Sequence, residues 1–86
     1  MIVSFLEGEN ILKLSEGHLG EAYRISDLSH LNKVVQKRLL DLGVIEGVEI
    51  SYIRKMPFGG PYILEVCGQY ISLRKKDVDY IEVEEV

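Results

Sequence analysis

The fold is decided by one stretch of the sequence, 29-SHLNKVVQKRLLDLGVIEG-47, because the hydrophobic period changes within it. Its first part repeats apolar residues at steps of three, one, four and three: Leu31, Val34, Val35, Leu39 and Leu42. That spacing predicts one apolar stripe on a helix. Ser29 is expected to cap the start of this helix. Gly43 stands where a left-handed residue would end it, with Val44 folding back onto the last turn.

From Gly47 onward the apolar residues alternate, which is the period of a strand. A proline- and glycine-rich loop at 56–61, a tight turn at Gly68-Gln69 and one helical turn within 74–79 interrupt the alternation. Residues 11–17 resemble a single turn that ends at a glycine. Five short strands are expected, at 21–28, 48–53, 62–67, 70–73 and 81–83. The pattern predicts a mainly β fold, a small closed barrel with a helical insertion after the first strand.

The bulk composition fits one small globular domain. The chain has 86 residues, of which 47% are hydrophobic and 28% charged. No apolar run approaches the roughly 20 residues that a membrane span needs, and the first residues lack the basic start of a signal peptide. We therefore expect a cytoplasmic protein with no membrane span, made of an N-terminal extension (1–10) and one domain (11–86).

Charge is distributed unevenly along the chain. The net charge of −4 disfavours a nucleic-acid partner. Residues 24–76 nevertheless carry nine basic and five acidic side chains, whereas both ends are acidic. Two interpretations stay open: the ends neutralise the middle within the fold, or a basic face meets an acidic partner or anionic headgroups.

Catalytic and metal-binding signatures are sparse. Neither histidine belongs to a recognisable motif, and no glycine-rich phosphate loop precedes a helix, so the sequence predicts no enzyme. Scattered candidates for metal ligands are His18, Glu21, His30 and Cys67. Their separation leaves the metal ligands unknown and no cofactor evident. The acidic end, with Glu82, Glu84 and Glu85, would attract cations loosely or serve only as a solvated terminus.

A family resemblance becomes specific at Arg38–Gly47. This segment resembles the helix-to-strand segment of the FeoA family, and four later pieces follow in the same order and spacing: Pro57–Pro61, Gly68, Ile71–Arg74 and Ile81–Val83. The resemblance covers residues 11–84. It implies an SH3-like barrel and a small cytoplasmic accessory that binds FeoB, a membrane transporter of ferrous iron with a GTPase domain.

The same resemblance keeps a second function open. Similar domains end some metal-dependent repressors, so the alternative is a metal-responsive domain that binds Fe(II) or another divalent transition metal. A reader of proline-rich peptides is disfavoured, because the chain has no Trp and its tyrosines are scattered.

Two sets of residues follow from these expectations. The fold is expected to depend on Leu39, Leu42, Gly43, Gly47, Pro57 and Pro61. A partner is expected to contact the exposed helix face and the neighbouring loop, through Lys33, Lys37, Arg38, Met56, Phe58 and Gly59. Phe58 is apolar at a loop tip, and it either meets the partner or folds back to cap the barrel.

Overall fold

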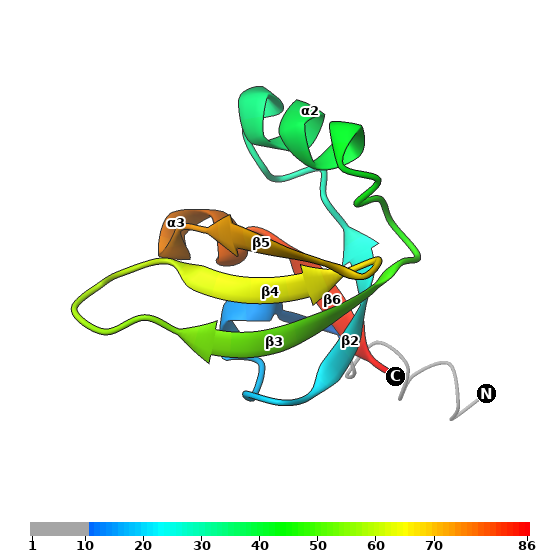
Figure 1. The fold of residues 1–86 in the computed structure, drawn as a ribbon. Coiled ribbons are helices and arrows are strands. Elements are labelled where there is room, and N and C mark those ends of the chain that lie inside the picture. The colour runs from blue at the N-terminus through cyan, green and yellow to red at the C-terminus, as the bar shows by residue number, and fades with distance from the viewer. Residues whose placement is uncertain (1–10) are drawn as a thin grey trace.

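The computed structural model describes residues 11–86, which form one curved antiparallel sheet with a helix above it (Figure 1). The six strands lie in the order β1-β6-β2-β3-β4-β5. In chain order the elements are β1 (Ile11–Lys13), η1 (Leu14–Glu16), β2 (Ala22–Asp27), α2 (Lys33–Asp41), β3 (Glu49–Lys55), β4 (Tyr62–Val66), β5 (Gln69–Leu73), α3 (Lys75–Val78) and β6 (Glu82–Glu85). The mainly β, SH3-like fold is confirmed.

Two details of the predicted barrel differ. The sixth strand, β1, comes from residues expected to form a turn; the turn begins later, at η1, and β1 pairs with β6 instead. The sheet is also not closed, because β1 and β5 are its two edges and are not paired with each other. The inserted helix therefore follows β2, the second strand.

Every second side chain along the strands is buried, as the alternation predicted. Residues of β3, β4 and β5 that face inward are all buried: Ile50, Tyr52, Tyr62, Leu64, Val66, Ile71 and Leu73. Leu14 and Val78, from the short helices, are fully buried in the same core. Removal of these apolar surfaces from water is the main source of stability in a domain of this size.

Helix α2 begins three residues later than predicted. Asn32, not Ser29, is its N-cap, and the Asn32 side chain accepts a hydrogen bond from the Val35 N–H at 2.9 Å. Ser29 instead donates its backbone N–H to Asp27 Oδ1 at 2.8 Å, so it belongs to the turn that follows β2. Both residue types cap helices well, and the turn at Asp27 decides between them.

The end of α2 follows the predicted pattern. Gly43 has a φ of 83°, and its N–H donates to Leu40 O while the Val44 N–H donates to Leu39 O. This pair of bonds is the Schellman motif. Gly47 has a φ of 94° and turns the chain into β3.

The predicted apolar stripe of α2 is only partly buried. Val35 and Leu39 are the buried residues of the helix. Val34 is 79% exposed and Leu42 is 37% exposed, so neither belongs to the buried core. Polar bonds hold this end instead: Gln69 Nε2 donates to Leu42 O at 2.7 Å, and Arg38 Nη2 donates to Ser72 O at 3.2 Å.

The remaining turns agree with the sequence with one shift. The loop at 56–61 joins β3 to β4, and α3 lies within the expected helical turn. The tight turn between β4 and β5 is Cys67-Gly68, one residue earlier than predicted, and both residues have positive φ. Within the described residues no helix has the length and apolarity to cross a membrane. The expected N-terminal extension, 1–10, lies outside the described residues.

Candidate functional site

An open groove of about 560 Å³ runs along one face of α2. Its helix wall consists of residues at helical spacing, namely Lys33, Gln36, Lys37 and Leu40. Its other wall comes from the two loops that flank the helix, with Leu28 before it and Val44, Ile45 and Glu46 after it. The groove therefore exists because the chain folds back on both sides of a short helix.

Two polar side chains of the groove are occupied in holding its walls. Glu46 Oε2 accepts a hydrogen bond from the Leu28 N–H at 3.1 Å, which joins the two flanking loops. Gln36 Nε2 donates to Leu31 O at 2.7 Å, which joins the helix to the loop before it. These bonds keep the groove open without a ligand, so binding would cost little ordering of the backbone.

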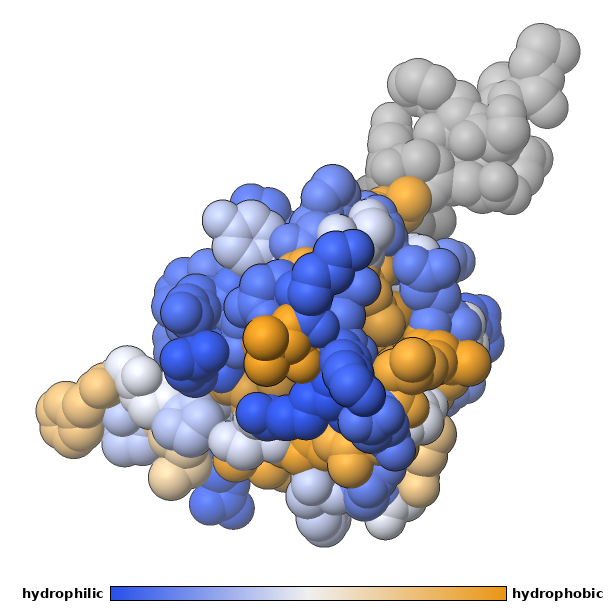
Figure 2. Space-filling model, turned by 90° about the horizontal axis from the view of Figure 1, so that it is seen from above, coloured by the Kyte–Doolittle hydropathy of each residue, from blue (hydrophilic) through white to orange (hydrophobic). Residues whose placement is uncertain are grey.

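The groove combines apolar surface with positive charge. Leu40 is 62% exposed and Ile45 is 46% exposed. Lys33 and Lys37 project beside them, and the Lys37 amine forms a solvent-exposed ion pair with Asp41 at 3.7 Å. Figure 2, which looks down on α2, shows apolar surface enclosed by hydrophilic side chains. Such a surface suits a partner that offers apolar side chains flanked by carboxylates.

The structure divides the predicted contact residues among three places. Lys33 and Lys37 line the groove. Arg38 lies outside the groove and bonds to β5 through Ser72 O. The β3–β4 loop, with Met56, Phe58 and Gly59, projects from the opposite end of the sheet, away from α2 (Figure 1). The helix and the loop therefore do not form one continuous surface.

Phe58 stands at the tip of that loop with its side chain in solvent. Its relative exposure is 103%, so the alternative in which it folds back to cap the barrel is wrong. Its φ is 59° and that of Gly59 is 75°, and the Gly60 N–H closes the turn on Pro57 O at 3.1 Å. A bulky residue in this left-handed region is unusual, so the loop presents an aromatic ring at some cost in backbone strain.

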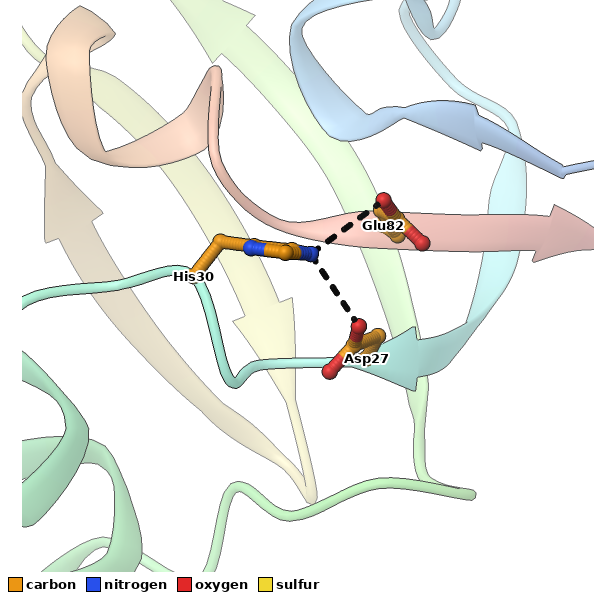
Figure 3. A group of neighbouring side chains, drawn as sticks. All are labelled: Asp27, His30 and Glu82. Atoms are coloured by element: carbon orange, nitrogen blue, oxygen red, sulfur yellow. Dashed lines mark ion pairs between the residues drawn. The ribbon is translucent and has the colours of Figure 1, made fainter.

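The second candidate site brings His30, one of the predicted metal ligands, together with the carboxylates of Asp27 and Glu82. His30 Nε2 lies 3.5 Å from Asp27 Oδ2 and 3.8 Å from Glu82 Oε2 (Figure 3). The donor atoms of all three side chains are within 4.8 Å of one another. The backbone hydrogen bond from Ser29 lowers the pKa of Asp27, so this carboxyl is ionised at neutral pH.

The other predicted ligands lie elsewhere. His18 and Glu21 line a separate hollow beside Tyr23, whose hydroxyl accepts a hydrogen bond from the His18 N–H at 2.8 Å. Cys67 is exposed in the β4–β5 turn. No sequence pattern joins Asp27 to Glu82, because they meet through the pairing of β2 with β6.

Comparison with known proteins gives consistent results. The family model of the FeoA domain matches residues 12–85. An Fe(2+) transport protein A/Fe(2+) transporter FeoB fusion protein from Porphyromonas gingivalis (strain ATCC BAA-308 / W83) is 32% identical over 73 residues. That match covers 85% of this chain and 8% of the fusion protein, so the chain spans less than a tenth of this relative.

Two solved structures share the fold over most of the chain. The solution structure of FeoA protein from Chlorobium tepidum has a TM-score of 0.82 and 27% identity, covering 87% of this chain and 70% of that one. A crystal structure of ScaR with bound Zn²⁺ has a TM-score of 0.75 and 29% identity, covering 87% of this chain and 37% of that one.

Proposed function

This chain belongs to the FeoA domain family, and from that premise we propose that it is a non-catalytic accessory of ferrous iron transport that binds the cytoplasmic part of a FeoB-type membrane transporter. The observation that carries the proposal is the relative in which the two proteins are fused. Fusion raises the effective concentration of two parts for each other, which is useful when those parts bind. We propose that this chain makes the same association, in the cytoplasm.

The groove along α2 is the surface that we propose for this contact. It has exposed apolar side chains, Leu40 and Ile45, at its centre and the amines of Lys33 and Lys37 at its rim. An apolar centre with a polar rim is the usual anatomy of a protein interface. The partner segment would therefore place apolar side chains in the groove and carboxylates against the two lysines.

The experiment measures the affinity of the chain for the purified cytoplasmic part of a FeoB-type transporter. Leu40→Asp puts a charge into the apolar centre and should weaken binding roughly thirtyfold or more, as at an interface hot spot. The matched control is Val34→Asp, on the same helix but outside the groove, where the side chain is 79% exposed. It should leave the affinity within about twofold, as expected for a position outside the contact.

Substitution of the two lysines tests the same contact independently. Lys33→Glu with Lys37→Glu should weaken binding and reduce its dependence on salt, because the rim charges contribute through screened attraction. Lys55→Glu with Lys76→Glu, which makes the same change in net charge at two exposed lysines outside the groove, is the control. The proposal is overturned if the chain does not bind at large excess, or if the groove variants bind as tightly as their controls.

A further inference from the structure

Three side chains of the types that can bind a metal ion meet on the outer face of the sheet, at the point where β2 ends and β6 begins. Asp27 and Glu82 are register partners across these two strands. His30 follows Asp27 by three residues, in the loop that leads to α2, and its Nε2 points toward both carboxylates (Figure 3). Side chains from three separate segments therefore converge on one small volume.

The separations of the donor atoms match those around a metal ion better than those of hydrogen bonds. Charge-assisted N–H···O bonds are about 2.7–2.9 Å long, whereas His30 Nε2 lies 3.5 and 3.8 Å from the two carboxylate oxygens. Metal–ligand bonds of about 2.0–2.2 Å place neighbouring ligand atoms roughly 3.0–3.5 Å apart. The shorter of these two separations, 3.5 Å, lies within that range, and the longer, 3.8 Å, exceeds it by a few tenths of an ångström.

The orientation of Asp27 supports the same interpretation. Its Oδ1 accepts the Ser29 N–H at 2.8 Å, and this bond directs Oδ2 toward His30. The next residue, Leu28, is fixed in turn by its bond to Glu46 at 3.1 Å. Hydrogen bonds of this kind to a ligating carboxylate are the usual support of a metal site.

The cluster holds two carboxylates and one histidine, so it carries an excess of negative charge when His30 is neutral. Two carboxylates that face each other across paired strands repel. His30 compensates only when it is protonated. Lys13 is the register partner of Glu82 on its other side, and Lys75 is engaged with Asp79 at 3.1 Å. These lysines border an adjoining hollow of about 560 Å³, which gives room for water ligands.

We propose that Asp27, His30 and Glu82 bind one divalent transition-metal ion of the Mn²⁺, Fe²⁺ and Zn²⁺ class, with water in the remaining positions. A mixed set of one imidazole and two carboxylates suits these ions, whereas Mg²⁺ and Ca²⁺ prefer oxygen alone. The site ties β2, β6 and the loop before α2 together. It does not depend on the proposed transporter partner.

The test is calorimetric titration of Zn²⁺ into the untagged, metal-stripped full chain, with Mg²⁺ present in excess. We expect one ion per chain and a rise in melting temperature by mass action. His30→Ala and Glu82→Gln should each weaken binding by at least about tenfold, since loss of even an outer support of a metal ligand costs 10–100-fold. In the unaltered chain, the imidazole nitrogen signals of His30 should shift on addition of Zn²⁺, and those of His18 should not.

Matched controls separate this site from loose attraction elsewhere. His18→Ala removes the other histidine, Cys67→Ser removes the exposed thiol, and Glu84→Gln removes a carboxylate two residues along β6. Each should leave the affinity within about twofold, because none of these side chains is part of the cluster. The proposal is overturned if Zn²⁺ does not bind, if Mg²⁺ abolishes binding, or if a control variant loses as much affinity as His30→Ala.

Discussion

The sheet and α2 use their apolar residues in different ways. In β3, β4 and β5 every inward-facing apolar side chain is buried, from Ile50 to Leu73. In α2 only Val35 and Leu39 are buried, while Val34 and Leu40 are 79% and 62% exposed. Both elements show a regular apolar period in the sequence. The difference indicates that the strand pattern specifies the core, whereas α2 leaves apolar side chains exposed, one of which, Leu40, lines the groove.

The largest loss of stability is expected from a substitution in the core of the sheet. Leu64 lies in β4 and is fully buried. Leu64→Ala should lower the free energy of unfolding by about 2–5 kcal/mol, the range for deletion of a buried leucine side chain. Urea denaturation measures this value. A loss below about 1 kcal/mol would mean that the core is looser than the structure shows.

A second effect in the sheet depends on pH. Burial raises the pKa of Tyr52 to about 12 from an ordinary 10.0. The unfolded chain loses this proton at lower pH than the folded chain, so stability is full below pH 10 and falls as pH rises toward 12. The slope from this group is at most about 1.4 kcal/mol per pH unit. Tyr52→Phe should flatten the profile relative to Tyr70→Phe, where the ring is exposed.

A smaller loss of stability is expected at the start of α2, where Ser29 serves as the control for Asn32. Asn32→Ala removes the cap on the Val35 N–H and should cost about 1 kcal/mol of stability. Ser29→Ala keeps the backbone N–H that Ser29 donates to Asp27, so it should cost little. Thermal unfolding of both variants would show the order. If Ser29→Ala proved the more harmful, the helix would begin where the sequence pattern placed it.

At the tip of the β3–β4 hairpin, a substitution is expected to raise stability and not to lower it. Phe58→Asn keeps the left-handed backbone with a residue that tolerates it, and no packing is lost because the ring is fully exposed. We expect the isolated chain to gain about 0.5–1 kcal/mol, since a φ of this kind strains a bulky residue. A loss of stability on denaturation would show that the ring packs against the protein.

The smallest effect on stability belongs to the groove. Leu40→Ala should change the free energy of unfolding by less than about 0.5 kcal/mol, because the side chain is mostly exposed. Its partner on the same helix, Leu39→Ala, should cost about 2–5 kcal/mol, because Leu39 is buried in the core. Equal losses from the two variants would remove the distinction between the sheet and α2 on which the binding proposal depends.

The sequence predicted most elements of the fold because their signals are local. Alternation identified the strands from β3 onward, and Gly43 marked the end of α2. The start of the helix was misplaced because Ser29 and Asn32 are both good caps, and only the turn at Asp27 excludes the first. The edge strand β1 is three residues long, too short to show a period, and pairing with β6 makes it a strand.

The candidate sites were less predictable because they join residues that are far apart in the sequence. Lys33 and Lys37 were correctly placed outside the apolar stripe, but no pattern shows that Leu28 and Ile45 complete a groove with them. Arg38 was expected to contact a partner in the same way as the two lysines. Its hydrogen bond to Ser72 instead links α2 to β5. His30 was a candidate ligand, yet Glu82 reaches it only through strand register.

The central claim is that this FeoA-family chain binds a FeoB-type transporter through the groove on α2. The most direct test is to titrate the cytoplasmic part of that transporter into the isotope-labelled chain and follow the backbone amide signals. We predict saturable shifts at 28, 33–40 and 44–46, with β4 and β5 unchanged. No shifts at large excess, or shifts confined to the hairpin loop at 56–61, would contradict the claim.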